Sequence, residues 1–473
     1  MTRTFSRRRW AAAALAAALA AVPTAVVGTA DAGTPAGFAR FYGQKVKWQA
    51  CSVDDVVQDC AWVSVPVDWA DPAGETLALK VTRHRTTGTR KGSLLLNPGG
   101  PGASGAQFVA TATKAFGKKL VAAYDLVGWD PRGVGESSPL TCPPSATAEF
   151  RKAFLPDSVA TRRQLERRAV VWAQACRAAS GPVFDHVDTV SNARDLDVLR
   201  AVLGEKKLSY AGLSYGTRLG LFYADLFPGR IGRMVLDASV DPTTDNAGFW
   251  RGASLAAERG FSDYLAGCAA RVACPLAGQK PSQARIKVGR LIGAPGPAQD
   301  ALANTVAALA KAPKTWPELD EVLTAALRGE SGTGDDAGPD VANAAINCLD
   351  LPDHRTAVQV MADARRASAT RPVFGHVMMA GTLCPQWPVP AVTKPHPVTA
   401  RGSGPILVVG TTHDTATPYE WAVSTARHLD AGRLLTRKGT GHVAYSRSAC
   451  VTEAVDGFLV DGVLPAAGKV CAD

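Results

Sequence analysis

The chain has 473 residues, of which 46% are apolar and 20% charged, and its formal net charge is +10. This length suggests two to three domain-sized pieces or one enlarged domain, and the composition excludes a disordered chain. Lys and Arg are scattered along the sequence rather than gathered in stripes, which argues against nucleic-acid binding.

The N-terminus is typical of a secretory signal peptide. Arginines at 7–9 precede an apolar stretch at 11–21, and small residues around Ala32 suit cleavage after that residue. The apolar run is too short to span a bilayer, which disfavours a membrane anchor. The first two arginines also resemble a twin-arginine export signal. We expect residues 1–32 to be removed and the mature protein to be secreted without a stable membrane anchor.

Ten cysteines in an exported chain predict five disulfide bonds. The sequence has no Cys-x-x-Cys pair and no cluster of His and Cys, so we expect no metal and no cofactor. The sequence does not fix which cysteines pair. Pairing neighbours in chain order closes five local loops, and this is the arrangement that we expect. The pairs are then Cys51–Cys60, Cys142–Cys176, Cys268–Cys274, Cys348–Cys384 and Cys450–Cys471.

The chain begins with two segments of alternating polar and apolar residues and continues with uniformly apolar runs. The alternating segments, 62–70 and 76–85, predict two antiparallel strands. The uniform runs predict strands that are covered on both faces, as in a parallel sheet. Helical periodicity lies between these runs, so the predicted class is α/β. The uniform runs are 93–97, 124–130, 208–212, 232–239, 405–410 and 432–438.

Residues 242–400 interrupt the pattern of strands with a stretch that is mostly helical. An excursion of this size between two strands predicts a cap over the carboxyl-terminal edge of the sheet, where open α/β sheets bind ligands. We therefore predict a signal peptide at 1–32, a sheet domain formed by 33–241 and 401–473, and the inserted helical cap.

The pattern Gly-Leu-Ser-Tyr-Gly around Ser214 lies between a predicted strand and a predicted helix. This is the setting of a nucleophile elbow, in which a sharp turn exposes a serine. The serine needs a histidine to take its proton and a carboxylate to orient that histidine. In an α/β-hydrolase these residues follow in the order Ser, acid, His, which selects Asp414 and His442. His428 lies in a predicted helix, and we interpret it as structural.

The surroundings of the acid and the histidine support this assignment. Asp414 follows a predicted buried strand and precedes residues 417–420, which we interpret as a capping box with Pro418 at the first helical position. His442 lies in a glycine-rich loop after the last predicted strand. We interpret the neighbouring His413 as incidental.

An oxyanion hole requires two backbone N–H donors. Tyr215, which follows the nucleophile, supplies the first. The second should come from the loop "NPGGPG" after the third predicted strand, where the prolines have no N–H and Gly99 and Gly100 remain available. These glycines do not form a phosphate-binding loop, because no Gly-Lys-Ser/Thr ending follows them.

Five motifs of the chain resemble those of the secreted tripeptidyl aminopeptidases of actinobacteria, which are relatives of proline iminopeptidase. The resemblance covers nearly the whole mature chain and implies an α/β-hydrolase fold with a mostly parallel sheet and a helical cap. By position, it assigns the second oxyanion role to Gly100, and this chain has Pro98 where proline iminopeptidases have histidine. The motifs are "NPGGPG", "GWDPRGVGESSP", "GLSYGTRLG", "GTTHDTATP" and "GTGHVAY", in this order.

The second of these motifs contains an aspartate that invites a catalytic interpretation. We instead expect Asp130 to fix the turn through a salt bridge with Arg132.

The resemblance implies a secreted serine exopeptidase that releases short peptides, expected to be tripeptides, from free N-termini through an acyl-enzyme at Ser214. A carboxylesterase or small-molecule amide hydrolase is the alternative, because a triad alone does not choose the acyl group. A non-enzymatic binding module would require four separate catalytic features to be accidental. The sequence leaves the oligomeric state and the residue preferred at the scissile bond open.

An exopeptidase also needs a carboxylate that pairs with the substrate ammonium. Asp350, which follows Cys348 in the cap, is our candidate, and a structural or exposed aspartate is an equally open interpretation. Glu258, on a predicted cap helix, is the reserve candidate.

Overall fold

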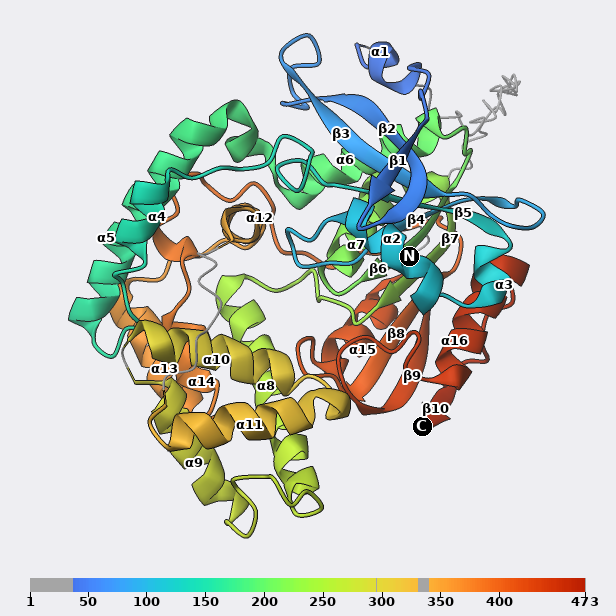
Figure 1. The fold of residues 1–473 in the computed structure, drawn as a ribbon. Coiled ribbons are helices and arrows are strands. Elements are labelled where there is room, and N and C mark those ends of the chain that lie inside the picture. Colours follow the sequence, from blue (N-terminus) through green and yellow to red (C-terminus); the bar gives the residue numbers. More distant parts are fainter. Residues whose placement is uncertain (1–36, 295, 331–339, 473) are drawn as a thin grey trace, which may run out of the picture.

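The computed structural model describes residues 37–294, 296–330 and 340–472, and the expected signal peptide lies outside these ranges. Ten strands form a single sheet in the order β1-β2-β3-β5-β4-β6-β7-β8-β9-β10 (Figure 1). The antiparallel pairs are β1 with β2, β2 with β3 and β3 with β5, and the remaining neighbours run parallel. The strands are β1 (Gln49–Val53), β2 (Val56–Pro66), β3 (Thr76–His84), β4 (Gly92–Asn97), β5 (Tyr124–Trp129), β6 (Leu208–Leu213), β7 (Ile231–Asp237), β8 (Ile406–His413), β9 (Gly432–Thr440) and β10 (Val470–Ala472).

Both faces of the parallel part are covered by helices, as the uniformly apolar runs predict. Within β4, Leu95 packs into one core while Leu94 and Leu96 pack into the other. The first core lies under α6 (Thr189–Val202), α7 (Tyr215–Leu226) and α15 (Tyr419–His428). The second lies under α2 (Gly105–Ala115), α3 (Lys118–Val121) and α16 (Ala449–Asp456). The predicted strands are confirmed, whereas β1 and β10 were not expected.

Between β7 and β8 the chain leaves the sheet, and its described residues form seven α-helices there, which we call the cap helices. Apolar residues of α8 to α11 enclose a core of their own, separate from the two cores of the sheet. In Figure 1 the cap helices lie to the left of and below the strands. They are α8 (Asn246–Cys268), α9 (Pro281–Ile292), α10 (Pro297–Leu309), α11 (Trp316–Leu327), α12 (Val341–Asp350), α13 (Ala357–Thr370) and α14 (Gly375–Ala380).

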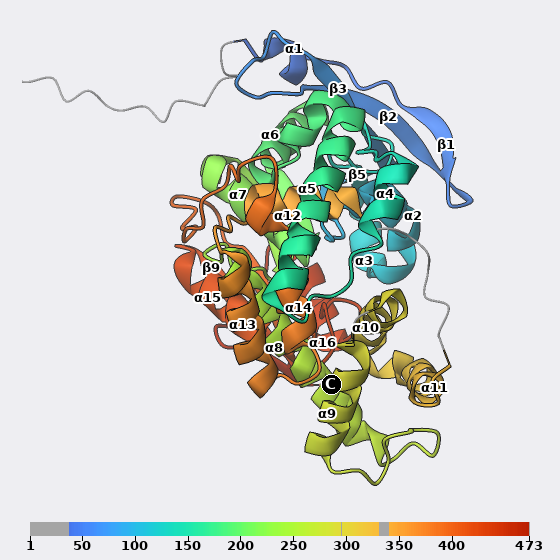
Figure 2. The ribbon, with the colours of Figure 1, turned by 90° about the vertical axis from the view of Figure 1, so that its left-hand side faces the viewer.

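Helix α5 (Val159–Ser180) precedes the elbow in sequence but packs against the cap helices. Figures 1 and 2 both show it beside them, next to α4 (Pro144–Phe150). The buried Arg162 donates hydrogen bonds from Nη1 to the carbonyl oxygens of Ala380, at 2.8 Å, and Thr382, at 2.6 Å. The predicted boundary at 242 assigned this helix to the sheet domain. Its residues Trp172, Ala173 and Cys176 pack into the first core of the sheet, and the helix also contacts α13 of the cap.

Shorter elements complete the chain. They are α1 (Ala39–Tyr42), the 3₁₀ segments η1 (Gly181–His186), η2 (Pro228–Arg230), η3 (Pro313–Thr315) and η4 (Cys384–Gln386), and the π turn η5 (Gly457–Asp461).

All ten cysteines are paired, and the pairing in chain order is confirmed. The five bonds join the cysteines that we expected, from Cys51–Cys60 to Cys450–Cys471. Each bond closes a local loop, so none of them ties the cap helices to the sheet.

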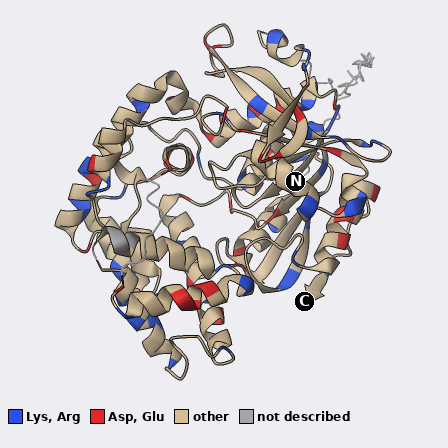
Figure 3. Cartoon of the chain, viewed as in Figure 1, with Lys and Arg blue, Asp and Glu red and all other residues tan. Residues whose placement is uncertain are grey.

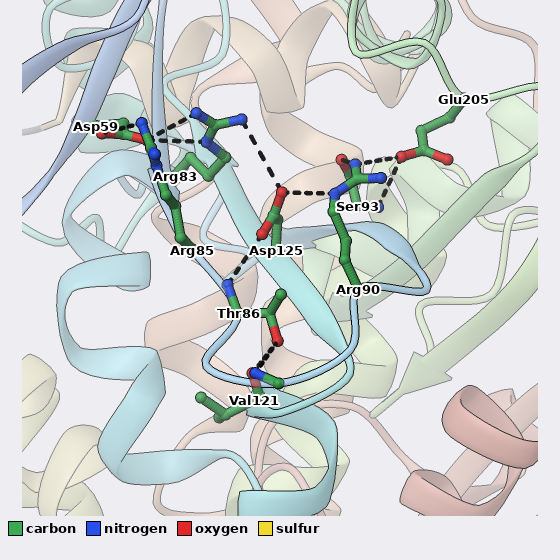
Figure 4. Close-up of polar contacts among 10 residues, drawn as sticks. Asp59, Arg83, Arg85, Thr86, Arg90, Ser93, Val121, Asp125 and Glu205 are labelled. Carbon is green, nitrogen blue, oxygen red and sulfur yellow. Dashed lines mark hydrogen bonds and ion pairs between the residues drawn. The ribbon is translucent and has the colours of Figure 1, made fainter.

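Charged side chains cluster where the parallel strands begin, at the edge opposite the elbow (Figure 4). Asp125 of β5 accepts hydrogen bonds from Arg90 Nε at 2.8 Å and from Thr86 N at 2.9 Å. Glu205, just before β6, accepts from the other end of Arg90 and from Ser93 N, both at 2.8 Å. This network joins the starts of three neighbouring strands.

Basic and acidic residues are interspersed over the helices and strands (Figure 3), as the scattered sequence pattern predicts. In the described part of the chain, no helix is both long and apolar enough to cross a membrane.

Candidate active site

Ser214 occupies the turn between β6 and α7 with φ of +55° and ψ of −123°. A non-glycine residue in this region is strained, and such strain is typical of a nucleophile elbow. The turn is tight enough to require its flanking glycines: a Cβ on Gly212 would lie 2.3 Å from the carbonyl oxygen of Gly216, and one on Gly216 would lie 2.8 Å from that of Asn97. Strand, turn and helix therefore have the arrangement that the sequence predicts.

Two backbone N–H groups are available beside the serine. Gly99 donates its N–H to Asn97 Oδ1 at 2.9 Å, so that group is engaged. Among the hydrogen bonds of the described residues, none uses the N–H of Gly100. The N–H of Tyr215 begins α7 and has no acceptor within its helix. A Cβ on Gly99 would lie 3.1 Å from Tyr215 N, which shows how closely the glycine loop approaches the elbow. This arrangement favours Gly100 and Tyr215 as the oxyanion donors.

The expected acid and histidine are in contact. His442 Nδ1 lies 2.9 Å from Asp414 Oδ1 and 3.1 Å from Oδ2. Because an ionised carboxylate only accepts, Nδ1 carries the proton and Nε2 is left to accept one. Asp414 is buried, and its Oδ1 also accepts from the N–H groups of Ala416 and Thr417, both at 2.9 Å. These bonds fix the carboxylate that orients the imidazole.

The serine, acid and histidine follow β6, β8 and β9, which run parallel, so all three lie at the same edge of the sheet. Among the hydrogen bonds of the described residues, none joins Ser214 Oγ to His442. In the absence of substrate, such catalytic contacts are commonly long and tighten when substrate binds.

One local interpretation around the acid is wrong. Helix α15 begins at Tyr419 with Pro418 at its N-cap and no side-chain cap, so residues 417–420 form no capping box. In a capping box the side chain of Glu420 would accept the N–H of Thr417, but Asp414 already accepts this N–H. His413 Nδ1 lies 2.9 Å from Asp263 of α8, so this histidine joins a cap helix to the loop of the acid.

The expected salt bridge between Asp130 and Arg132 is also wrong. Asp130 accepts from Ser104 Oγ, the N-cap of α2, and from Glu136 N at 2.8 Å. Arg132 instead pairs with Asp195 through two bonds of 2.7 Å in the interior. Asp130 thus fixes its turn through hydrogen bonds, and the arginine joins a helix distant in sequence.

Asp350 is buried beside the elbow and has internal partners for both oxygens. Thr189 donates from N to Oδ1 at 2.8 Å and from Oγ1 to Oδ2, and Arg218 Nε lies 3.6 Å from Oδ2. Burial raises the pKa of Asp350 to about 6, against the opposing effects of Arg218 and Thr189. With 1% of its surface exposed, Asp350 offers a substrate ammonium no open face.

Sequence reasoning missed the link from Asp350 to the oxyanion donor. The hydroxyl oxygen of Tyr215 lies 2.6 Å from Thr189 Oγ1, and Arg218 donates from Nη2 to the carbonyl oxygen of Asp350 at 2.9 Å. The end of cap helix α12 is thereby bonded to helix α7. No local pattern around Thr189 signals this contact, because its partners lie far apart in the sequence.

Glu258, the reserve candidate, binds the backbone next to a short helix inside the cap. Its Oε2 accepts from the N–H groups of Val373 and Phe374, both at 3.1 Å, just before α14. Burial raises the pKa of Glu258, and these amide donors oppose that effect. Gly260 lies on the side of α8 opposite Glu258. It is Gly260 that approaches Thr415, the residue after Asp414. Glu258 therefore faces away from the acid.

The start of α12 contacts the oxyanion loop. Asn343 donates from Nδ2 to the carbonyl oxygen of Pro101 at 2.8 Å. The exposed Asp340 lies nearby, since a Cβ on Gly102 would come within 2.9 Å of its Oδ2. A cavity of about 520 Å³ opens along the same loop, lined among others by Asp54, Pro98 and Gly102. In the described residues, no group of three His, Cys, Asp or Glu could hold a metal ion.

The parallel sheet covered on both faces, the elbow after β6 and the acid–histidine pair after β8 and β9 define an α/β-hydrolase. The family model of the TAP-like proteins matches residues 371–471. The serine protease Hip1 of Mycobacterium tuberculosis is 35% identical over 96% of this chain and 96% of its own length. The tripeptidyl aminopeptidase of Streptomyces coelicolor is 33% identical over 90% and 86% of the two chains. The chain belongs to the α/β-hydrolase family that includes these two proteins, and it is a hydrolase enzyme.

Two further proteins are similar to this chain to different extents. Carboxylesterase B of M. tuberculosis is 34% identical over 87% of this chain and 86% of its own length. The crystal structure of the proline iminopeptidase of Mycobacterium smegmatis matches 84% of this chain and 97% of its own, with 16% identity and a TM-score of 0.38.

Proposed function

We propose that the protein is a secreted serine exopeptidase that releases tripeptides from free N-termini through an acyl-enzyme on Ser214, His442 and Asp414. The observation that carries the proposal is the strained Ser214 at the turn before α7, together with the bond from His442 Nδ1 to Asp414. The name of the Streptomyces relative, tripeptidyl aminopeptidase, supports the size of the released fragment.

In the proposed reaction Ser214 Oγ attacks the scissile carbonyl carbon while His442 Nε2 takes the hydroxyl proton. The carbonyl oxygen becomes an oxyanion that accepts hydrogen bonds from the N–H groups of Gly100 and Tyr215. The C–N bond then breaks, and His442 gives its proton to the leaving amine. Water, deprotonated by the same histidine, releases the tripeptide and restores the serine. Asp414 stabilises the imidazolium at each stage.

A substrate ammonium requires a carboxylate that is open to the cleft, and the burial of Asp350 and Glu258 speaks against both. We propose Asp340 for this role. It is exposed, it lies against Gly102, and Gly102 is two residues from the oxyanion donor Gly100. The three residues of the acyl group span roughly 10 Å. A substrate amine at that distance from Ser214 is compatible with a position beyond Gly102, at the far end of the oxyanion loop.

Secretion is supported by the five disulfide bonds, which persist in oxidising compartments. The N-terminal sequence of protein recovered from a culture medium tests this, because we expect it to begin just after Ala32. Protein that stays in the cell with residue 1 intact would contradict the proposal.

A carboxylesterase is the second candidate, because the relative named carboxylesterase B is about as similar to this chain as the peptidases are. Family membership alone does not separate ester from amide substrates.

The decisive experiment compares the purified protein on a tripeptide anilide, on the same compound with an acetylated N-terminus, and on a simple ester. If a carboxylate binds the ammonium, acetylation should lower kcat/KM roughly thirtyfold, which corresponds to about 2 kcal/mol of transition-state binding. Fluorophosphonate should label Ser214, and Ser214→Ala should lose both label and activity. Equal turnover of free and acetylated substrate, or faster cleavage of the ester, would favour the carboxylesterase.

The same substrates test the amine site. Asp340→Asn should narrow the difference in kcat/KM between the free and the acetylated substrate. The matched variant Asp54→Asn, which changes an aspartate that lines the cavity, should preserve this difference. If Asp54→Asn narrows the difference instead, the amine site belongs to the β1–β2 turn.

A further inference from the structure

The loop that carries His442 has an irregular backbone. Gly441 has φ of +123°, Val443 of +68° and Ser446 of +63°, so three of six successive residues lie in the left-handed region. For a β-branched residue such as Val443 this conformation is a genuine outlier. It persists only where surrounding contacts impose it, and the position of the imidazole depends on those contacts.

Asp237, the last residue of β7, supplies these contacts on one side of the loop. Its carboxylate accepts from the N–H of Ala444, at 3.1 Å to Oδ1 and 3.0 Å to Oδ2, and from the N–H of Tyr445 at 2.8 Å to Oδ2. On the other side, Gly441 N donates to the carbonyl oxygen of His413 at 3.1 Å. His442 is therefore held between two anchored segments of backbone.

The same residue also holds the nucleophile. The backbone carbonyl oxygen of Asp237 accepts from Ser214 N at 2.9 Å. Asp237 thus contacts the elbow through its main chain and the histidine loop through its side chain. Because β7 lies between β6 and β8, the position is fixed by the centre of the sheet.

If Asp237 only filled space in the core, a carboxylate at this position would lower the stability of the fold. Only 1% of its surface is exposed, and the N–H groups of the loop are its hydrogen-bond donors. Burial raises the pKa of Asp237 to about 6; Asp414 raises it further, while the loop amides and His442 lower it. A buried carboxylate with amide donors alone destabilises a core relative to an apolar residue.

We propose that Asp237 is a positioning residue for catalysis, which fixes the distance between Ser214 and His442 by binding the backbone of Ser214 and that of Ala444 and Tyr445 in the loop that carries His442. The inference rests on the proposed catalytic role of His442. It adds that the triad depends on a fourth residue that touches neither the substrate nor the reacting atoms.

The test is Asp237→Asn in the disulfide-bonded protein. Asparagine keeps the shape of aspartate, but it loses the charge, and its NH₂ group replaces one of the two oxygens. If the NH₂ group replaces Oδ1, it faces the N–H of Ala444, and if it replaces Oδ2, it faces the N–H groups of both Ala444 and Tyr445, so at least one loop N–H meets a donor. We expect kcat to fall about 10- to 100-fold and KM to change less than twofold, because the substrate still binds while the proton transfer is misaligned. Activity is expressed per site titrated to completion with fluorophosphonate, so that unfolded protein is not counted.

A matched control is Asp456→Asn. Asp456 is also buried and accepts from the side-chain hydroxyl of Tyr445 at 2.7 Å, so it stabilises the same loop without binding its backbone. This variant should lower the melting temperature and leave kcat within threefold. If Asp237→Asn does not fold, Asp237→Ser replaces it, since the shorter serine side chain removes the carboxylate without placing an NH₂ group against the loop amides.

The inference is overturned if Asp237→Asn and Asp237→Ser keep kcat within threefold, if the loss appears in KM, or if Asp456→Asn loses as much kcat. His442→Ala separates this result from the proposed function. If His442→Ala remains active, the triad itself is wrong; if it is inactive while both Asp237 variants are active, the triad stands and only the positioning role fails.

Discussion

The side-chain amide of Asn343 in cap helix α12 donates a hydrogen bond to the carbonyl oxygen of Pro101 in the oxyanion loop. This bond joins the cap to the residue that follows Gly100. Asn343→Ala should therefore loosen the loop and lower kcat roughly fivefold, which corresponds to a hydrogen bond of about 1 kcal/mol.

Steady-state kinetics on a tripeptide anilide checks this expectation. Asn347→Ala is the control, because Asn347 donates to Asn343 Oδ1 at 3.0 Å on the same helix. Equal effects of the two substitutions would mean that the helix, and not the bond to Pro101, determines the rate.

Asp414→Asn should lower kcat roughly 10³- to 10⁴-fold, because asparagine no longer stabilises the imidazolium or fixes the tautomer. The neighbouring pair of His413 and Asp263 offers a matched control, since Asp263→Asn removes a carboxylate from a histidine one residue away. We expect the control to retain kcat within about threefold. A small effect of Asp414→Asn in the same assay would remove this residue from the proposed triad.

Tyr215→Phe removes the hydroxyl that contacts Thr189 and leaves the backbone N–H in place. We expect the free energy of unfolding to fall by about 1–2 kcal/mol and kcat to change only a few fold, because the oxyanion is bound by the main chain. Thr189→Val should cost more stability, since Thr189 Oγ1 also donates to Asp350. Urea unfolding with parallel kinetics measures both quantities. A hundredfold loss of kcat in Tyr215→Phe would contradict a purely structural hydroxyl.

The buried Asp350 should make stability depend on pH. Its pKa rises from 3.8 to about 6 on folding, so the unfolded chain loses this proton first and the folded chain binds more protons between these values. This group therefore lowers the free energy of unfolding as pH rises from about 4 to 6, by roughly 3 kcal/mol in total, with no further change above that range.

Asp350→Asn removes this dependence. The difference in unfolding free energy between the wild type and Asp350→Asn, measured with urea at pH 4, 5, 6 and 7, should shift in favour of the variant as pH rises and then become constant. A difference that does not vary with pH would contradict the raised pKa.

The network at the start of the parallel strands should affect stability without affecting catalysis (Figure 4). Asp125→Asn should lower the free energy of unfolding by about 2 kcal/mol, because it weakens charged hydrogen bonds at a nearly buried site. Glu136→Gln, which breaks an exposed pair with Lys80, should cost less than about 0.5 kcal/mol. Thermal unfolding measures both, and kcat should stay unchanged. A fall in kcat for Asp125→Asn would reveal coupling across the sheet.

The strands and the candidate triad could be predicted because their signals are local. Strands such as β4 and β8 are uniformly apolar, which indicates burial on both faces. The elbow needs only five residues, and the order Ser, acid, His then selects Asp414 and His442. The short β1 and β10 were missed: β1 is half exposed and β10 has three residues, so neither has a clear periodicity.

The remaining features depend on contacts between distant segments, which local patterns do not record. Arg132 has an aspartate two residues away in sequence but pairs with Asp195. Asp350 lies two residues after Cys348, but its burial depends on contacts with Thr189 and Arg218, which are distant from it in the sequence. The anchoring of the histidine loop by Asp237 joins residues more than 200 positions apart.

The buried Arg162, whose guanidinium binds the backbone at Ala380 and Thr382, has a consequence for how such enzymes can be recombined. A chimaera that received only residues 242–400 from a relative would place a foreign surface against α5 and leave this arginine without its two carbonyl acceptors. Exchanging substrate preference between relatives therefore requires the transplant of two segments, one that includes α5 and one between β7 and β8. The elbow lies between them in the sequence and can stay with the recipient.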